Sequence, residues 1–189
     1  MSSRESFIRV VRRAQTIISI LLFIIVFFFC WKFTNLDIRE IQLSNWGKSG
    51  WIGRVWNTAV CTFAISIFVN SFLYLRNNNR IKYKRLFYFL FGFLSLCLFT
   101  VGYFNVDWRV IHNIAAVSYF FFYPFTIYLF SHLNRKYLSY KDWQHKVIIS
   151  IIMTVVPIIL MSMFTGMAIA EIAHTSLVII YNIKLSIGD

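Results

Sequence analysis

The feature that most constrains this chain is the length of its uncharged stretches. Five stretches of 18 or more residues lack Asp, Glu, Lys and Arg: 14–31, 55–75, 86–106, 110–134 and 147–170. A helix rises about 1.5 Å per residue, so each stretch can cross a hydrocarbon core about 30 Å thick. We therefore expect a helical protein that crosses the membrane several times.

The last apolar region is long enough to need division. It covers 37 residues, 147–183, and is interrupted only by Glu171. One helix of that length would measure about 55 Å, too long for an ordinary bilayer. A break near Phe164, Thr165 and Gly166 gives two spans joined by a tight hairpin. The sequence thus predicts an all-α, polytopic membrane helical bundle with six transmembrane helices, at about residues 14–31, 55–75, 86–104, 110–133, 147–164 and 167–184.

The spans leave little of the chain for anything else. Apolar residues make up 59% of its 189 residues, against roughly 45–50% in soluble domains. We expect residues 1–189 to form a single integral membrane domain, which argues against kinases, nucleotide-binding motors and receptors with a folded ectodomain. Cys30, Cys61 and Cys97 lie in apolar runs without metal-ligand spacing. No cofactor is expected.

Basic residues concentrate on one side of the predicted bundle. Of the 19 Lys and Arg, 14 lie before the first span, in the second and fourth connections, or in the tail. The positive-inside rule then predicts a multi-pass protein of the cell inner membrane with both termini in the cytoplasm. Lipid headgroups are the default partner of bases beside a membrane. The net charge of +12 therefore predicts anionic lipids at the cytoplasmic face, and no nucleic acid.

A group of polar residues falls near the outer third of the predicted bundle. A charged side chain at mid-span carries a penalty of about 2.5–3.5 kcal/mol, which makes intramembrane ionisable residues functional candidates. Glu171 and His174 share a helical face, in a Glu-x-x-His pattern that can supply two metal ligands. The predicted ligand-binding residues are Asn57, Asp107, His112, Glu171 and His174. No catalytic residue is predicted, and the identity of any metal stays unknown.

A structural interpretation of the same residues stays open. Asp107 suits the N-cap of the fourth span, His112 can lie at the headgroup level, and inter-helix hydrogen bonding accounts for Asn57. A metal site would need more ligands than the Glu-x-x-His pair, and the chain contains neither HxxxH nor HExxH.

Short motifs in the first outer loop and at the outer ends of three spans form a recognisable pattern. Its positions are Ser44, Gly47, Asn57, Gly102, Asp107 and His112. The pattern covers about residues 40–130 and resembles a six-span prokaryotic membrane family of unknown function, itself distantly similar to the DRAM/Frag group. The resemblance implies six helices, an outer polar cluster and a lipid-linked role, and it supplies no activity.

The leading functional prediction is a membrane protein, non-enzymatic, with a lipid- or partner-binding pocket near its outer face. Its expected partners are membrane lipids, another membrane protein or further copies of the same chain. Three alternatives remain. A small transporter or channel subunit would use the carboxylates and histidines for protons or cations. A metal-dependent lipid hydrolase would resemble the alkaline ceramidases, although their paired late-span histidines are missing. A membrane effector of a defence operon would disturb the bilayer by oligomerising.

Overall fold

Long helices account for most of the structure. The computed structural model describes residues 3–34, 37–48, 50–104 and 107–187. The long helices are α1 (Ser3–Thr34), α2 (Gly50–Asn77), α3 (Lys84–Tyr103), α4 (Arg109–Leu133), α5 (Tyr140–Met163) and α6 (Ala168–Ile187). Two short 3-10 helices, η1 (Leu43–Lys48) and η2 (Arg135–Tyr137), lie in the connections. All six long helices are long and apolar enough to cross a membrane. The predicted all-α fold with six transmembrane helices is confirmed, and this is an integral membrane protein.

Several helices extend beyond the predicted spans. α1 begins at Ser3 where the predicted span begins at residue 14, and α5 begins at Tyr140 where the span begins at 147. The spans were bounded by charge, but backbone hydrogen bonding continues past the edge of the apolar run. At α5 the boundary is set by a cap, because the Ser139 hydroxyl accepts from the Asp142 backbone N–H at 3.1 Å.

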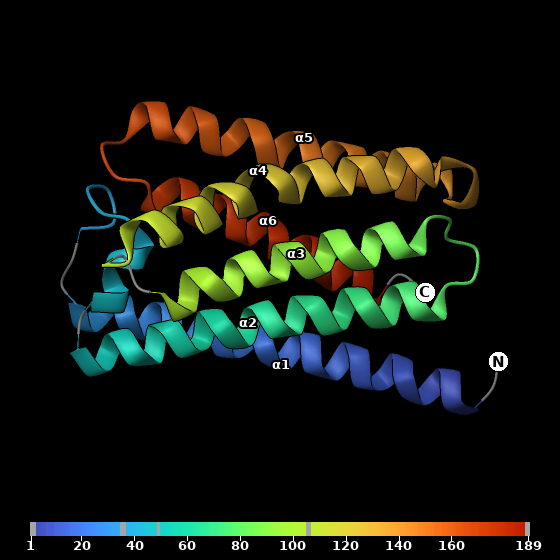
Figure 1. The fold of residues 1–189 in the computed structure, drawn as a ribbon, viewed down its shortest axis with the longest axis horizontal. Coiled ribbons are helices and arrows are strands. Elements are labelled where there is room, and N and C mark those ends of the chain that lie inside the picture. The colour runs from blue at the N-terminus through green and yellow to red at the C-terminus, as the bar shows by residue number, and fades with distance from the viewer. Residues whose placement is uncertain (1–2, 35–36, 49, 105–106, 188–189) are drawn as a thin grey trace.

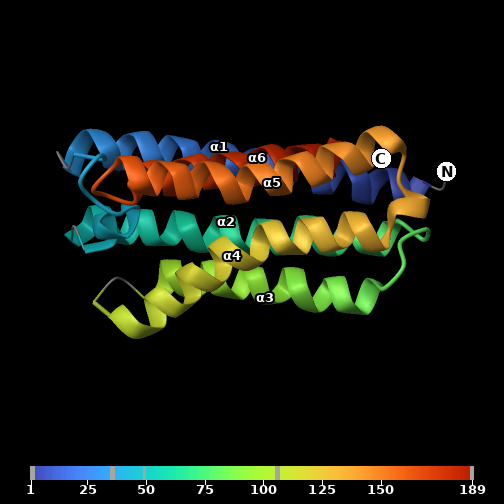
Figure 2. The same cartoon turned by 90° about the horizontal axis from the view of Figure 1, so that it is seen from above.

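The helices form one bundle with two distinct ends (Figure 1). α1 begins and α6 ends at one of them, together with the α2–α3 and α4–α5 connections; we call it the terminal end. The connections α1–α2, α3–α4 and α5–α6 meet at the opposite end, the loop end. Seen from above, α1, α5 and α6 lie along one side and α3 along the other, with α2 and α4 between them (Figure 2).

Close packing of α2 against α3 positions the loop end. A Cβ added to Gly102 would lie 2.8 Å from Cys61 Sγ and 3.0 Å from the Asn57 carbonyl oxygen. Small residues let membrane helices approach closely in this way. α4 is visibly bent (Figure 2). Pro124 lies inside it, and proline removes a backbone donor and crowds the preceding turn.

Candidate functional site

The α1–α2 connection folds over the loop end of the bundle as a cover. Its 3-10 helix η1 carries Trp46, which is 0% exposed. The Trp46 ring lies 5.3 Å from that of Phe27 and 5.0 Å from that of Trp56, between α1 and α2. Tryptophans near a membrane boundary commonly sit at the headgroup level. This one instead fills the bundle and holds its cover in place.

The α5–α6 hairpin is joined to this cover by backbone hydrogen bonds. Gly166 N–H donates to the Arg39 carbonyl at 2.9 Å, and Ala168 N–H donates to the Ile41 carbonyl at 2.9 Å. A Cβ on Gly166 would meet the Glu40 and Ile41 backbone at 2.5 Å. Only glycine fits this approach without displacing one of the two segments. The predicted break near Gly166 therefore lies where the hairpin contacts the cover.

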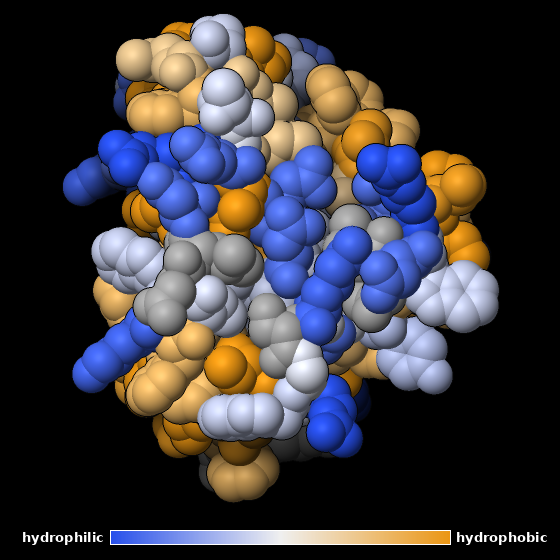
Figure 3. Space-filling model, turned by 90° about the vertical axis from the view of Figure 1, so that its left-hand side faces the viewer, coloured by the Kyte–Doolittle hydropathy of each residue, from blue (hydrophilic) through white to orange (hydrophobic). Residues whose placement is uncertain are grey.

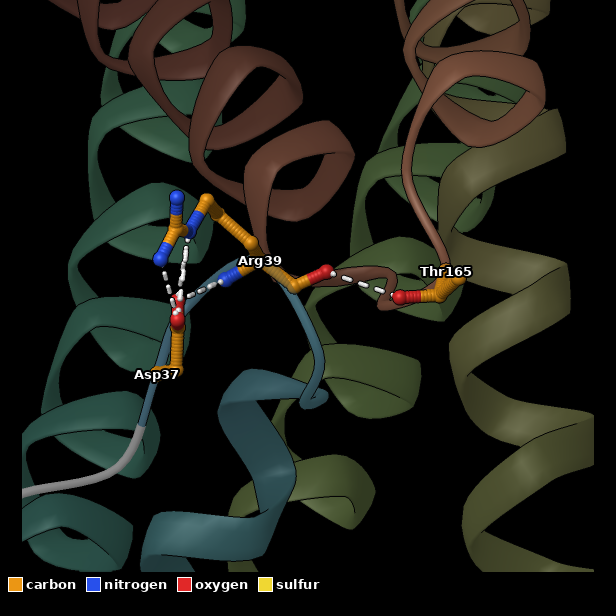
Figure 4. A network of polar contacts seen from close by, with 3 residues as sticks. All are labelled: Asp37, Arg39 and Thr165. Carbon is orange, nitrogen blue, oxygen red and sulfur yellow. Dashed lines mark hydrogen bonds and ion pairs between the residues drawn. The ribbon is translucent and has the colours of Figure 1, made fainter.

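Side chains support the same junction (Figure 4). The Thr165 hydroxyl donates to the Arg39 carbonyl at 3.4 Å. The Arg39 guanidinium pairs with the Asp37 carboxylate at 2.7 Å, and its hydrogen bonds lower the pKa of Asp37 to about 2. Both charged groups are open to solvent, so the pair orders a surface turn and belongs to no enclosed site.

Glu171 ties α6 to the start of η1. Its Oε2 accepts from the Leu43 backbone N–H at 2.7 Å. The first backbone N–H groups of a helix have no intrahelical partner, and a carboxylate is a strong acceptor for one of them. The side chain lies in the first turn of α6 and is half-buried. It therefore stands beneath the cover.

A small cavity lies under the cover, between α1, α2, α3, α4 and α6, and is called the loop-end cavity below. Its volume is about 70 Å³, room for a few water molecules. Aromatic and aliphatic side chains form much of its wall. The polar side chains that line it are Ser44, Asn57, His112, Tyr119, Glu171 and Thr175.

A hydrogen bond orients the ring of His112, which is 3% exposed. Its Nδ1 lies 2.8 Å from the Phe104 carbonyl oxygen. A carbonyl can only accept, so this bond assigns the proton to Nδ1 and leaves Nε2 of the neutral ring as an acceptor. Ser44 Oγ and Tyr119 OH are buried without a hydrogen-bond partner among the described residues. The cavity thus offers groups whose hydrogen-bonding capacity is not filled by the part of the chain that the structure describes.

Three of the five predicted ligand-binding residues, Asn57, His112 and Glu171, line the loop-end cavity together. One further position of the predicted pattern, Ser44, is part of the same lining. Gly47 lies against Asn57, because a Cβ on Gly47 would lie 2.6 Å from Asn57 Oδ1. Gly47 therefore lets the cover descend onto α2.

Asp107, another of the predicted ligand-binding residues, does not line this cavity. Its carboxylate pairs with Lys48 Nζ at 3.1 Å, and the side chain is 62% exposed. It lines an open cleft of about 540 Å³ at the surface of the loop end, where hydrophilic side chains gather (Figure 3). A charge at the surface avoids desolvation.

His174 also lies outside the loop-end cavity. It is 1% exposed and packs against aromatic rings of α4, 4.6 Å from Phe120 and 5.7 Å from Tyr119. One helical turn carries it deeper into the bundle than Glu171, so the Glu-x-x-His pair does not converge on one ligand. No group of three or more His, Cys, Asp or Glu side chains in the described ranges could hold a metal ion.

An apolar groove between α1 and α6 is the feature that the sequence reasoning missed. We call it the α1–α6 groove; its volume is about 370 Å³. Its lining comprises Phe23, Ile24, Phe27, Phe28, Leu43, Ile172, Thr175, Ser176, Ile179 and Ile180. Phe23, Leu43 and Thr175 also line the loop-end cavity. The groove-lining residues of α1 and α6 have the apolar composition of any lipid-facing helix. No local sequence pattern therefore distinguishes the groove.

Comparisons with known proteins identify no relative of this chain. No family model, curated protein or solved structure matches the chain, and the resemblance to the six-span prokaryotic family stays a prediction.

Proposed function

We propose that this protein binds a membrane lipid, with an acyl chain in the α1–α6 groove and a small polar end in the loop-end cavity. The observation that carries the proposal is their shared wall of Phe23, Leu43 and Thr175. An apolar groove thereby adjoins a cavity whose lining includes polar side chains. This arrangement matches the two parts of an amphipathic ligand.

The volumes of the two sites indicate which part of the ligand each can hold. Ligand sites typically measure about 300–1,000 Å³, and the α1–α6 groove at about 370 Å³ lies within that range. The loop-end cavity, at about 70 Å³, does not. It suits a hydroxyl or an ammonium group and is too small for a sugar or a phosphodiester with its substituents.

The chemistry of the loop-end cavity favours a hydrogen-bond donor. Its lining contains the Glu171 carboxylate and no Lys or Arg among the described residues. His112 Nε2 adds an acceptor when the ring is neutral. A phosphate would meet a carboxylate with no cation to offset it. The favoured ligands are therefore lipids with a free hydroxyl or a primary ammonium, and the protein acts by binding without catalysis.

Photocrosslinking tests the groove. The probes are diazirine-bearing acyl analogues of diacylglycerol, phosphatidylethanolamine and phosphatidylglycerol, applied to the purified protein in nanodiscs. Ser176 lines the groove and is exposed, so Ser176→Trp should fill it and abolish most labelling of α1 and α6. Ser162→Trp places the same ring on exposed α5, outside the groove, and should label like the parent protein. Equal labelling of both variants would overturn the proposal.

Competition between the probes tests the polar end. Diacylglycerol and phosphatidylethanolamine should label α1 and α6 more strongly than phosphatidylglycerol. His112→Leu keeps the approximate volume of the side chain but removes the Nε2 acceptor. It should reduce the preference for diacylglycerol and phosphatidylethanolamine over phosphatidylglycerol, while all three probes still label the α1–α6 groove. If phosphatidylglycerol labels as strongly as the other two in the parent protein, the donor preference is wrong.

A second candidate function is proton or cation transport. It is favoured by a buried hydrogen-bond network below the cavity, in which Asn182 Nδ2 donates to Tyr123 OH at 2.8 Å and Asn70 Nδ2 donates to Asn182 Oδ1 at 3.1 Å. Buried polar groups in a membrane bundle often mark an ion path. Proton or Na⁺ flux in proteoliposomes that Asn182→Leu abolishes would support it. Absence of flux in the parent protein would remove it.

A further inference from the structure

Two basic connections lie side by side at the terminal end of the bundle (Figure 1 and Figure 2). The first joins α2 to α3, and the second joins α4 to α5 through η2. The Lys82 backbone N–H in the first connection donates to Asn134 Oδ1 in the second at 2.8 Å. Lys82 Nζ also lies 5.4 Å from the centre of the Tyr137 ring. Segments that are 52 positions apart in the chain therefore form one surface.

Asn134 holds the two connections in a fixed arrangement. It is 0% exposed, and its Nδ2 donates to the Phe130 carbonyl at 3.2 Å. Its own carbonyl accepts from the Tyr137 backbone N–H at 2.9 Å and so supports η2. Ile81, which is 6% exposed, anchors the α2–α3 connection in the apolar core. The surface is thus ordered before a partner arrives, which lowers the entropy cost of binding.

The joined surface is strongly basic, and we call it the basic platform. Residues 76–85 and 134–141 contain eight Lys or Arg and no Asp or Glu. All eight except the half-buried Lys84 are exposed. An anion can therefore reach most of these charges without entering the bundle. The basic platform comprises Arg76, Arg80, Lys82, Lys84, Arg85, Arg135, Lys136 and Lys141.

Neutral groups position some of these bases without removing their charge. Lys84 Nζ donates to Asn79 Oδ1 at 3.4 Å, and the Arg135 guanidinium lies 4.6 Å from the centre of the Trp143 ring. An arginine above an aromatic face keeps its full charge and its N–H donors. These bases therefore remain able to bind an anion.

The distribution of acids concentrates the positive charge at this end. Asp142 directly follows the platform in the sequence, and its carboxylate accepts from the Ser139 hydroxyl at 2.6 Å. At the loop end, by contrast, Arg39 and Lys48 each pair with a carboxylate. Anions are therefore attracted to the platform more strongly than to the loop end.

We propose that the basic platform binds anionic phospholipids of the adjoining leaflet through their phosphates, with its two connections acting as one surface. The platform lies at the ends of four membrane-spanning helices, α2, α3, α4 and α5. Its bases are therefore at the level of the headgroups, where each adds to the attraction of an anionic leaflet. Tyr83 and Tyr140, which are 58% and 68% exposed, lie beside these bases in the sequence, and tyrosines favour the same level.

The platform is separate from the lipid site proposed above. It shares no residue with the lining of the loop-end cavity or of the α1–α6 groove, and it lies at the opposite end of the bundle from the cavity. The two sites also favour different lipids, because the loop-end cavity presents a carboxylate and the platform presents cations. This proposal therefore does not rest on the function proposed above.

Native mass spectrometry with phosphatidylglycerol and phosphatidylcholine tests the charge. Each base near an anionic leaflet contributes a factor of about five in affinity. Arg80→Gln with Arg135→Gln removes one exposed arginine from each connection and should weaken phosphatidylglycerol binding about 25-fold. The control, Arg54→Gln with Arg109→Gln, removes the same charge from exposed arginines of the loop end. It should bind phosphatidylglycerol like the parent protein.

A second comparison tests whether the two connections act as one surface. Asn134→Ala removes the acceptor of the Lys82 N–H and leaves every charge in place. It should weaken phosphatidylglycerol binding about fivefold, the contribution of one base. The control, Asn78→Ala, removes the acceptor of the Arg80 N–H within the α2–α3 connection alone, and should bind like the parent protein. If Asn134→Ala does not fold, the arginine variants decide the proposal.

Two outcomes would overturn lipid binding by the platform. The first is equal affinity of the parent protein for phosphatidylglycerol and phosphatidylcholine. The second is an equal loss of phosphatidylglycerol in the two arginine double variants. If single-stranded RNA then binds the parent protein but not the Arg80→Gln, Arg135→Gln variant, the platform serves a nucleic acid instead. Matching phosphatidylglycerol affinities of the Asn134→Ala and Asn78→Ala proteins would overturn the joint action of the two connections.

Discussion

The Glu171 carboxylate accepts the Leu43 backbone N–H at 2.7 Å, across 128 positions of the chain. This bond connects the first turn of α6 to the start of the cover. Glu171 also lines the loop-end cavity. The same side chain therefore holds the cover onto the bundle and contributes a polar group to the proposed lipid site. A change at Glu171 affects both.

Replacing Glu171 tests its role in closing the bundle. Glu171→Ala leaves the Leu43 N–H without its acceptor, and a buried unsatisfied donor costs about 1–3 kcal/mol. Glu171→Gln retains an oxygen acceptor on a side chain of the same length, so its free energy of unfolding should decrease less. Thermal unfolding in detergent, followed by tryptophan fluorescence, measures the difference. Glu40→Ala, at an exposed position of the cover, serves as the control. A Glu171→Ala protein as stable as Glu171→Gln would show that the bond adds nothing to stability.

Glycine at 166 should be required for the cover to dock. In Gly166→Ala the new Cβ would lie 2.5 Å from backbone atoms of Glu40 and Ile41. The two segments must then separate, which weakens the hydrogen bonds of Gly166 and Ala168. We expect faster proteolysis in the 37–48 segment and a lower melting temperature.

The matched control for that change is Gly92→Ala. Its Cβ would lie 3.6 Å from Phe68 Cε2, an ordinary contact, and alanine is favoured over glycine inside a helix by about 1 kcal/mol. Gly92→Ala should therefore melt at or above the temperature of the parent protein. If both variants behave alike, the close approach at Gly166 has no energetic consequence.

The surface pair at Asp37 predicts a pH dependence. The hydrogen bonds from Arg39 lower the pKa of Asp37 to about 2, from an ordinary value of about 3.9. The pair's contribution to the ordered turn is thus complete above about pH 4 and is lost as the pH falls through about 2. In Arg39→Gln the pKa of Asp37 should rise toward the ordinary value. Carboxyl ¹³C NMR of aspartate-labelled protein measures this, with assignment by Asp37→Asn; an unchanged pKa in Arg39→Gln would contradict the pairing.

Labelling from outside intact cells tests the orientation. The distribution of basic residues predicts that the loop end faces outward. In a background without Cys30, Cys61 and Cys97, Glu40→Cys should react with an impermeant maleimide in intact cells. Asn79→Cys, exposed at the terminal end, should react only after lysis. The reverse pattern would invert the topology.

Much of the architecture was predictable because the bilayer penalises charge so strongly. Uncharged runs longer than the hydrocarbon thickness leave few alternatives to spanning helices. The division of residues 147–183 followed from length alone, and α5 ends at Met163 before α6 begins at Ala168. Helix boundaries were less predictable, because the Ser139 cap and the basic first turns of α1 extend helices past the apolar run.

Part of the predicted set of polar residues lines one cavity for a similar reason. Asn57, His112 and Glu171 share a depth in the bundle, and depth can be read from distance to a span end. Depth in the bundle does not determine the direction in which a side chain points around its helix axis. Asp107 lies at the exposed surface and pairs with Lys48, and His174 packs against the rings of α4.

The sequence by itself determined six membrane spans, the position of the last hairpin and the level at which polar residues gather, because each depends on the desolvation of charge along a single helix. Only the tertiary structure decided which polar groups meet and where the α1–α6 groove lies. Those features depend on the rotation and contact of helices far apart in the chain. The Leu43–Glu171 bond and the shared wall of Phe23, Leu43 and Thr175 arise only when α1, η1 and α6 pack together.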